Sequence, residues 1–288
     1  ASGAENNVTI GKNAGTAITT GDRNIAIGTS ALLAEDAHGR NIAIGHSALS
    51  SLDAGAEGLN VAIGDLSGAA MSTGTENTLV GAVSGNDLTS GSRNTALGRN
   101  ALSLDTVGSR SVAVGWGSLQ NQNYTTATSN YNVSVGYNAG NDITTGIQNS
   151  FFGAQAGDSF VDANGNIAVG YQSLTADTEG NYSTAIGYAA LAAQNFTTNT
   201  TTHNVAVGYA SGNDVTTGQQ NTLLGSGSGA KLTDADYNTA VGKSALNTDV
   251  LGSISTAIGW EALKNQNFTT ATNSHNTAVG YQVGNDIT

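Results

Sequence analysis

The sequence is dominated by a short motif that recurs at nearly constant spacing along all 288 residues. The motif Asn/Ser-x-x-apolar-Gly places a glycine at positions 11, 28, 45, 64, 81, 98, 115, 136, 153, 170, 187, 208, 225, 242, 259 and 280. The positions of successive glycines differ by 17, except for one step of 19 and three of 21. Three steps of 17 and one of 21 make a block of 72, and four such blocks equal the chain length. Periodicity of this kind is typical of solenoids, in which like units stack on one another.

Each repeat unit begins with an alternating stretch such as Asn24-Ile25-Ala26-Ile27-Gly28. Alternation with a period of two indicates a β-strand, and we expect the two large residues to face the interior of the coil and Ala26 the opposite side. The rest of each unit is rich in Gly, Thr and Asn, which are poor helix formers. We therefore predict two short strands and two turns per unit. The whole segment, residues 1–288, is predicted to be an all-β parallel solenoid of sixteen coils, each of about 17 residues.

Stacking of like units brings the same residue of each coil into one column. Asparagine amides in register can hydrogen-bond along the stack, as in cross-β ladders, and glycine permits a positive φ or a close backbone approach. The predicted structural ladder consists of Asn24, Asn60, Asn94, Asn132, Asn166, Asn204 and Asn276, with Gly28, Gly64, Gly136, Gly208 and Gly280.

The alanine-rich strand face suggests that several chains pack together. A thin coil buries a small fraction of its surface, and alanine allows backbones to approach closely. We expect three chains to meet on this face, although a monomer with a mildly apolar surface is the alternative. The predicted axis residues are Ala26, Ala62 and Ala113, with the larger Leu79, Phe151 and Leu223 as periodic plugs.

Units such as Asn204-Val205-Ala206-Val207-Gly208-Tyr209 and Ser183-Thr184-Ala185-Ile186-Gly187 resemble the head repeats of YadA-like trimeric autotransporter adhesins. They are also similar to shaft repeats of phage tail fibres that carry a self-cleaving chaperone. The resemblance covers all sixteen units and implies a trimeric left-handed β-roll, forming part of a longer extracellular fibre. The units of this chain are longer than those usual in adhesin heads, so the choice between adhesin head and fibre shaft stays open.

The three longest steps between glycines insert polar arms rich in Thr and Asn, at 121–126, 194–198 and 265–270. The residue after the repeat glycine is aromatic on both sides of each arm. Aromatic faces beside amides and hydroxyls suit sugar rings, although such pairs can also simply pack beneath a loop. The candidate ligand-binding residues are Trp116, Tyr137, Tyr188, Tyr209, Trp260 and Tyr281, with Tyr124, Phe196 and Phe268 in the arms.

The amino-acid composition argues against several other classes of function. The chain carries 9 Lys and Arg against 21 Asp and Glu, a net charge of −12, which disfavours nucleic acid as a partner. It has no Cys, and no apolar run is long enough for a membrane helix. The four histidines have no carboxylate or serine set with a reason to converge, and Asn-Asp pairs such as Asn86-Asp87 are explained by Asx turns. We therefore predict no enzyme activity, no cofactor, no metal and no membrane insertion.

The first hypothesis for function is thus a stiff spacer. The chain would be a homotrimeric segment of an extracellular fibre that continues end to end, on a cell-surface appendage or a virion tail fibre. The second hypothesis is an adhesin head, in which the arms and aromatic pairs bind a surface glycan or a receptor.

Overall fold

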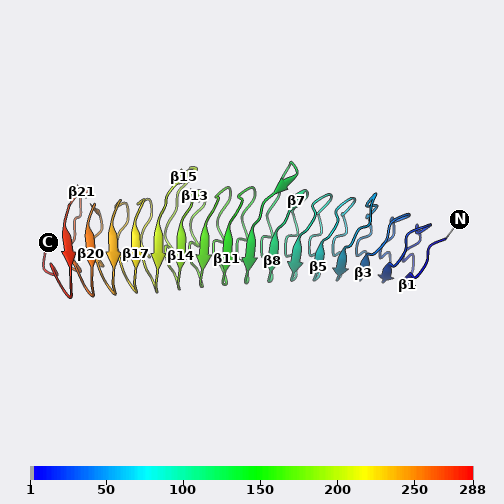
Figure 1. Cartoon of the computed structure of the whole chain (residues 1–288), viewed down its shortest axis with the longest axis horizontal. Coiled ribbons are helices and arrows are strands. Elements are labelled where there is room, and N and C mark those ends of the chain that lie inside the picture. The colour runs from blue at the N-terminus through cyan, green and yellow to red at the C-terminus, as the bar shows by residue number, and fades with distance from the viewer. Residues whose placement is uncertain (1–2, 288) are drawn as a thin grey trace. The chain divides into compact units, whose positions relative to one another are not determined.

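The computed structural model describes residues 3–287, which form strands, turns and bends without a helix. The chain divides into two compact units, Ala1–Thr145 and Gly146–Thr288. Each unit is a parallel β-solenoid whose strands lie side by side in chain order, as Figure 1 shows. The predicted all-β solenoid, with one coil for each repeat of the sequence, is confirmed.

In the first unit, each coil adds one three-residue strand to a parallel ladder. Equivalent residues of neighbouring coils are paired, so that Ala26 lies opposite Ala43 and Ile27 opposite Ile44. The strands are β1 (Val8–Ile10), β2 (Ile25–Ile27), β3 (Ile42–Ile44), β4 (Val61–Ile63), β5 (Thr78–Val80), β6 (Thr95–Leu97), β8 (Val112–Val114) and β10 (Val133–Val135).

The second unit has the same construction. Its strands are β11 (Ser150–Phe152), β12 (Ile167–Val169), β14 (Thr184–Ile186), β16 (Val205–Val207), β17 (Thr222–Leu224), β18 (Thr239–Val241), β20 (Thr256–Ile258) and β22 (Thr277–Val279).

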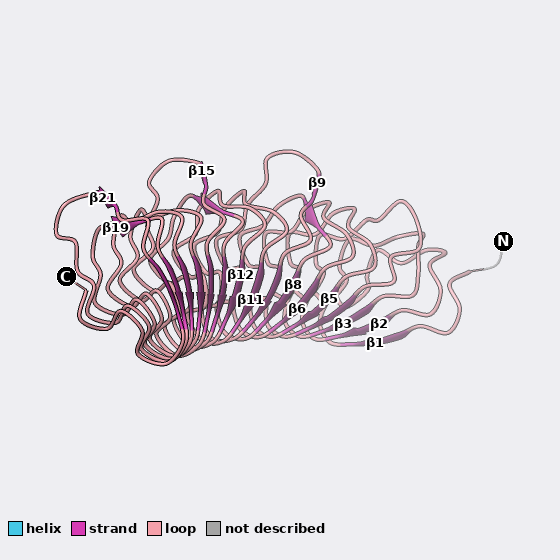
Figure 2. Cartoon of the chain, turned by 60° about the vertical axis from the view of Figure 1, so that its left-hand side comes forward, coloured by secondary structure: helices cyan, strands magenta, loops and turns pink. Residues whose placement is uncertain are grey.

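Three additional pairs of two-residue parallel strands stand beside the arms, and Figure 2 shows the arms near β9, β15 and β21 projecting beyond the neighbouring turns. The pairs are β7 (Gly108–Ser109) with β9 (Thr128–Ser129), β13 (Gly180–Asn181) with β15 (Thr200–Thr201), and β19 (Gly252–Ser253) with β21 (Thr272–Asn273).

The prediction of two regular strands in every coil is wrong, because the return path of each coil is broken by left-handed residues. Around Gly28, for example, Arg23, Ser30 and Leu32 have φ values of 59°, 58° and 50°. Such residues turn the chain and interrupt extended pairing. One three-residue strand per coil therefore carries the main ladder, and turns form most of the rest.

The two strand faces are the reverse of those predicted. The central residue of each strand points into the coil, and Ala26, Ala62 and Ala113 are fully buried within their own unit. Leu79, Phe151 and Leu223 are equally buried, so none of these six residues can line an axis between chains. The large residues on either side, such as Ile63 and Ile258, point outward and are 37% and 38% exposed. The alternation of residues identified the two strand faces correctly. The interior of the narrow coil, however, has space only for the face with the smaller side chains.

Size complementarity within the coil explains the larger central residues. Half of the coils combine a central alanine with a buried leucine in the turn, as in Ala96 with Leu102. Where the central residue is Leu79, the turn carries a glycine in its own coil and in the preceding one. A Cβ added to Gly85 or Gly68 would lie 2.9 Å from Leu79 methyl carbons. Leu79 thus fills space that two glycines leave open, and Leu223 contacts two glycines in the same way.

The repeat glycines allow successive coils to pack backbone against backbone. Gly208 has a φ of 138°, and a Cβ there would lie 2.6 Å from the carbonyl carbon of Gly225. Gly28, Gly64, Gly136 and Gly280 have φ values of 129°, 141°, 148° and 136°. These values lie in the region that only glycine adopts readily, which confirms the predicted reason for glycine at this position.

Substitutions of Leu79 and Gly85 should have coupled effects on the free energy of unfolding. We expect Leu79→Ala to lower the free energy of unfolding by about 2–5 kcal/mol, because it leaves a cavity beside two glycines. Gly85→Leu alone should also destabilise, because the new side chain collides with Leu79 and needs a positive φ. The double variant L79A/G85L should lose clearly less than the sum of the two, measured by urea unfolding. Additive losses would contradict the size-complementarity argument.

Candidate functional site

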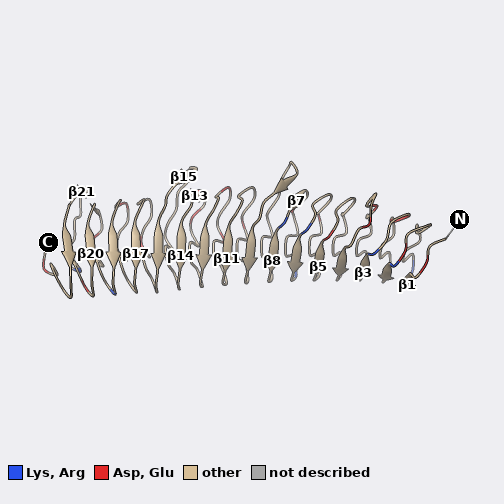
Figure 3. Cartoon of the chain, viewed as in Figure 1, with Lys and Arg blue, Asp and Glu red and all other residues tan. Residues whose placement is uncertain are grey.

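The outward strand face of each unit carries a row of exposed apolar side chains. Its residues alternate with the buried centre, and several are more than a third exposed: Ile63, Leu97, Phe152, Ile167, Ile186 and Ile258. No strand of either ladder contains a charged residue, and Figure 3 shows the strands without acidic or basic colouring. In-register pairing aligns these residues from coil to coil within each unit. We call this the outward aliphatic face.

The asparagine column lies at the start of each strand and is largely buried. Asn60 illustrates its contacts: the side-chain Oδ1 accepts a hydrogen bond of 3.0 Å from the backbone N–H of Asn77 in the next coil, and Nδ2 donates one of 2.9 Å to the carbonyl of Gly74. The predicted ladder is therefore present, but it runs mainly between amides and backbone. Asn24, Asn94, Asn132, Asn166 and Asn204 are buried, Asn276 is partly exposed, and Asn41, Asn77, Asn149, Asn221 and Asn238 extend the column.

Before each arm, an acid replaces an aliphatic residue in the coil interior. Asp105 is fully buried, and its Oδ1 accepts a hydrogen bond of 3.0 Å from the backbone N–H of Gly108. Its Oδ2 accepts one of 2.7 Å from Gln122, whose amide also donates to Ser111 at 2.8 Å. Asn132 in turn donates to the Gln122 oxygen at 2.9 Å. The first arm thus leaves the coil from a network of buried polar groups in which the Asp105 carboxylate and the Gln122 amide are paired. Asn130 accepts a hydrogen bond from Ser111 through its side-chain oxygen, and its Nδ2 has no hydrogen-bond partner among the described residues.

The same network recurs at the other two arms. Asp177 accepts hydrogen bonds from Gly180 N–H at 3.1 Å, from Phe196 N–H at 3.0 Å and from Gln194 at 2.5 Å. Asp249 accepts from Gly252, Phe268 and Gln266 in the same way. Burial raises the pKa of Asp105 and Asp177, and the hydrogen bonds from glutamine and backbone partly oppose that rise.

The arm aromatics support the arms from below and are mostly shielded from ligands. Tyr124 and Phe196 are only 4% and 5% exposed, so their assignment as ligand-binding residues is wrong. No feature of the repeat pattern indicates this burial, because it arises when a polar arm folds back over its one large side chain. Phe268 is partly exposed, and the tips of all three arms are exposed Thr, Asn and Ala.

The predicted aromatic pairs are stacked on the surface. Trp116 lies on Tyr137 with ring centroids 5.1 Å apart and planes 12° apart, and Trp260 lies on Tyr281 at 4.8 Å and 15°. In the second unit Tyr209, Tyr188 and Tyr171 form a three-ring stack, with centroids at 5.2 and 5.6 Å. Tyr171 was not predicted, because it flanks no arm.

We call these residues the aromatic column. All seven are between 37% and 71% exposed. Because the rings stack on one another, neighbouring rings occupy each other's faces and leave mainly their edges and hydroxyls to solvent. The column therefore suits edge contacts and hydrogen bonds better than stacking of a sugar ring between its members.

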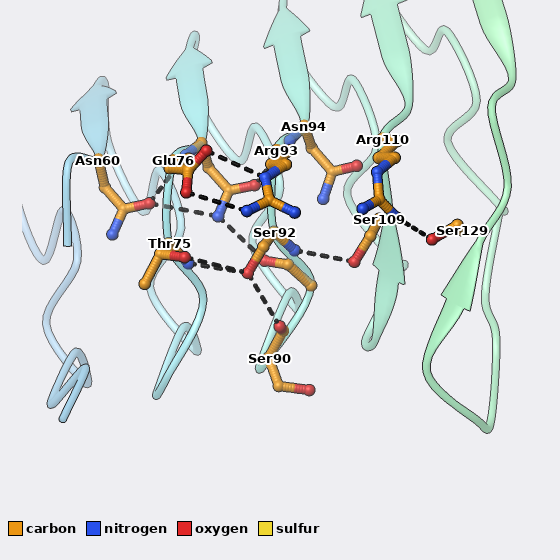
Figure 4. Close-up of polar contacts among 12 residues, drawn as sticks. Asn60, Thr75, Glu76, Ser90, Ser92, Arg93, Asn94, Ser109, Arg110 and Ser129 are labelled. Carbon is orange, nitrogen blue, oxygen red and sulfur yellow. Dashed lines mark hydrogen bonds and ion pairs between the residues drawn. The ribbon is translucent and has the colours of Figure 1, made fainter. Parts of the chain in front are cut away.

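Another corner of the first unit links coils by polar side chains (Figure 4). Arg93 donates two hydrogen bonds to Glu76 in the preceding coil, at 3.0 and 3.2 Å, and this ion pair lowers the pKa of Glu76. The hydroxyl of Ser92 accepts from the Thr75 N–H at 3.0 Å, and that of Ser109 accepts from the Ser92 N–H at 3.0 Å. These exposed contacts tie coils together but form no cleft.

The structure places His46 beside an acid and a serine, residue types that can act together in catalysis. His46 Nδ1 lies 3.0 Å from Asp65, and its Nε2 lies 3.4 Å from the Ser47 hydroxyl. The His46 and Asp65 side chains are both 59% exposed, and the contacts lie on an open surface. Nothing there excludes water or offers an oxyanion-binding group among the described contacts, so we assign no reaction to it.

Comparison with known proteins identifies no relative. No family model, curated protein or solved structure matches the chain. Within residues 3–287, no helix is long and apolar enough to cross a membrane. The resemblance to adhesin heads and tail-fibre shafts therefore stays a prediction.

The buried aspartates should make stability depend on pH. With a raised pKa, Asp105 and Asp177 bind protons more readily in the folded chain than in the unfolded one. Their contribution is fully present below the unfolded pKa of about 4 and is lost as pH rises through the folded pKa. We therefore expect the urea midpoint to rise as the pH falls from neutral toward about 4.

The variant D105N/D177N should flatten this dependence. The matched control D142N/D234N removes the same number of charges from exposed positions and should retain it. Equal slopes in the two variants would mean that general charge repulsion, rather than these two buried groups, sets the pH dependence.

Proposed function

We propose that this chain is a segment of an extracellular homotrimeric fibre, in which it acts as a stiff spacer. The observation that carries the proposal is the outward aliphatic face, on which no strand residue is charged and the third strand residue is large and apolar in every coil of both units. Isolated exposed aliphatic residues are ordinary, whereas a contiguous apolar patch of this kind marks an interaction surface.

Contact with other copies of the chain explains why this face is apolar, whereas a face exposed to water could equally carry polar residues. A charged or polar residue at the outward positions would be compatible with the fold, because the coil interior is filled from the other side. The third strand position is nevertheless large and apolar in every coil, from Ile10 to Val279. Copies of the same chain carry the same spacing between coils, so their apolar rows can match along the whole contact. We therefore propose that the chains meet on the outward aliphatic face, not on the alanine face expected from the sequence.

The spacer function follows from how the coils are joined. Within each unit every coil binds its neighbours through in-register strand pairing, the asparagine column and backbone hydrogen bonds at the turns, such as Gly28 N–H to Ile10 O at 2.8 Å. In a solenoid, stability is the sum of coil terms and nearest-neighbour terms, and bending requires many short hydrogen bonds to change together.

Adhesion through the aromatic column and the arms is the second candidate function. It is favoured by the high exposure of Tyr209 and Tyr281, which at 62% and 71% exceeds that of the other described aromatic side chains. Tyrosine hydroxyl groups and arm tips of Thr and Asn offer hydrogen bonds to a glycan or receptor.

Charge on the outward aliphatic face should separate the chains. We expect the wild-type segment to sediment with the mass of three chains, and the variant I63K/L97K/I186K/I258K to sediment as a monomer that remains β-solenoidal by circular dichroism. The control variant T125K/T197K/T269K places lysines on the exposed arm tips and should remain trimeric. A monomeric wild type, or a charged variant of unchanged mass, would contradict the trimer.

Removal of the indole rings distinguishes the two functions. The variant W116A/W260A should stay trimeric, since both rings lie on the surface beside Tyr137 and Tyr281. If the chain is an adhesin, binding on a glycan array should fall in this variant. If it is a spacer, neither form should bind above background.

A further inference from the structure

Four metal-ligating side chains converge in the first unit, apart from the arms and the aromatic column. Glu35, Asp36 and His38 lie in the turn that follows β2, and Asp53 lies in the corresponding turn of the next coil. One donor atom from each lies within 4.8 Å of the others. We call these four residues the first-block cluster. It combines one imidazole with three carboxylates and joins two successive coils.

Glu35 is the buried member of the cluster, whereas His38 is partly exposed and Asp36 and Asp53 are exposed. Glu35 is fully buried, and its two oxygens accept backbone hydrogen bonds from His38 N–H at 3.0 Å and Ala54 N–H at 3.4 Å. A carboxylate has further lone pairs beyond these two. Burial raises the pKa of Glu35, the two backbone hydrogen bonds and the neighbouring His38 oppose that rise, and the charge of Asp53 adds to it.

The imidazole of His38 supplies an independent indication of a ligand. Its Nδ1 is shielded from solvent and makes no hydrogen bond among the described residues. It lies 3.5 Å from Glu35 Oε1, and its ring is 29% exposed. The ring also borders a small surface pocket together with Asp22 and Arg40, through which solvent reaches it. A cation bound to this nitrogen and to the neighbouring carboxylates would give it the partner that it lacks.

The chain's own repeats provide an internal comparison for this cluster. The corresponding coils of the other three blocks retain a single acid and replace the other ligands with residues that bind metals poorly or not at all. The equivalent sets are Asp105, Thr106, Gly108 and Asn123; Asp177, Thr178, Gly180 and Asn195; and Asp249, Val250, Gly252 and Asn267. In those blocks a glutamine of the next coil donates a hydrogen bond to the acid. The first block has Leu52 at the position of this glutamine.

The geometry points to a binding site for a divalent transition-metal cation in the first-block cluster. Donors of imidazole nitrogen and carboxylate oxygen, four in number, match the set that zinc accepts. Because the ligands come from two consecutive turns, the ion clamps one coil to the next, at the place where the other blocks use an Asp–Gln hydrogen bond and an arm.

The test is a calorimetric titration of the full chain with zinc chloride. We expect one zinc ion per chain for the wild type. The variants H38G and D36T/D53N install residues that the equivalent coils already carry, so the fold should tolerate them. Each should weaken zinc binding by more than about tenfold, the lower end of the loss seen even for outer-sphere partners of a metal site. The control H46A removes an exposed imidazole beside Asp65 and should leave the affinity unchanged.

Three results would overturn the assignment. The first is no zinc-dependent heat with the wild type. The second is wild-type affinity in both H38G and D36T/D53N, with circular dichroism showing both variants folded. The third is loss of binding in H46A, which would place the ion at His46 instead. If H38G fails to fold, D36T/D53N alone decides the question. Binding of calcium chloride with no binding of zinc chloride would also refute a transition-metal site, because calcium takes oxygen ligands.

Discussion

The narrowness of the coil interior determines most of this structure. A single circuit of the backbone encloses space for a few side chains, and each coil fills that space in a limited set of combinations. A central alanine permits a leucine in the turn, whereas a central Leu79 or Leu223 requires glycines there. The same restriction sends the first and third strand residues of each coil outward, the third always large and apolar and the first aliphatic, Thr or Ser. The apolar surface proposed to mediate association is therefore a consequence of the small interior and of the period-two alternation of a strand.

The same constraint explains where sequence analysis succeeded and where it failed. The repeat spacing predicted the solenoid, the register and the stacked columns of Asn, Gly and aromatic residues, because identical positions must lie above one another. It could not decide which strand face was internal, since Ile and Ala alternate equally in both arrangements. The choice depends on volume: Ile25 and Ile27 together exceed what the coil can hold, whereas Ala26 leaves space for Leu32. A count of the other core residues per coil would have favoured the observed orientation.

The arms show a second limit of the sequence. Their composition predicted exposed polar loops, which the tips are, but not the buried base on which they depend. Asp105, Asp177 and Asp249 occupy the same position in successive blocks, and the equivalent position of the next coil is a glutamine each time. The recurrence of Asp followed one coil later by Gln could have been read from the sequence, and its physical reason is that a carboxylate in the core must be paired. Its partners are a backbone N–H of its own coil, the glutamine of the next coil and a backbone N–H of the arm. Tyr124 and Phe196 are buried for the same reason, as they cover that network.

A repetitive chain also makes departures from its own pattern informative. A ligand-type residue at a position where the equivalent coils carry Gly, Thr, Val or Asn is not required by the strand and turn pattern that these coils share. The position after the repeat glycine is Trp, Tyr or another residue in different coils, and the strand before it is the same in each. An aromatic residue at this position is therefore not needed for the fold. The first-block cluster is the stronger case, since an imidazole and two carboxylates replace Gly, Thr or Val, and Asn around one buried acid. The three exchanges bring ligand-type side chains to one point in space, and the cation proposed above would account for all of them together.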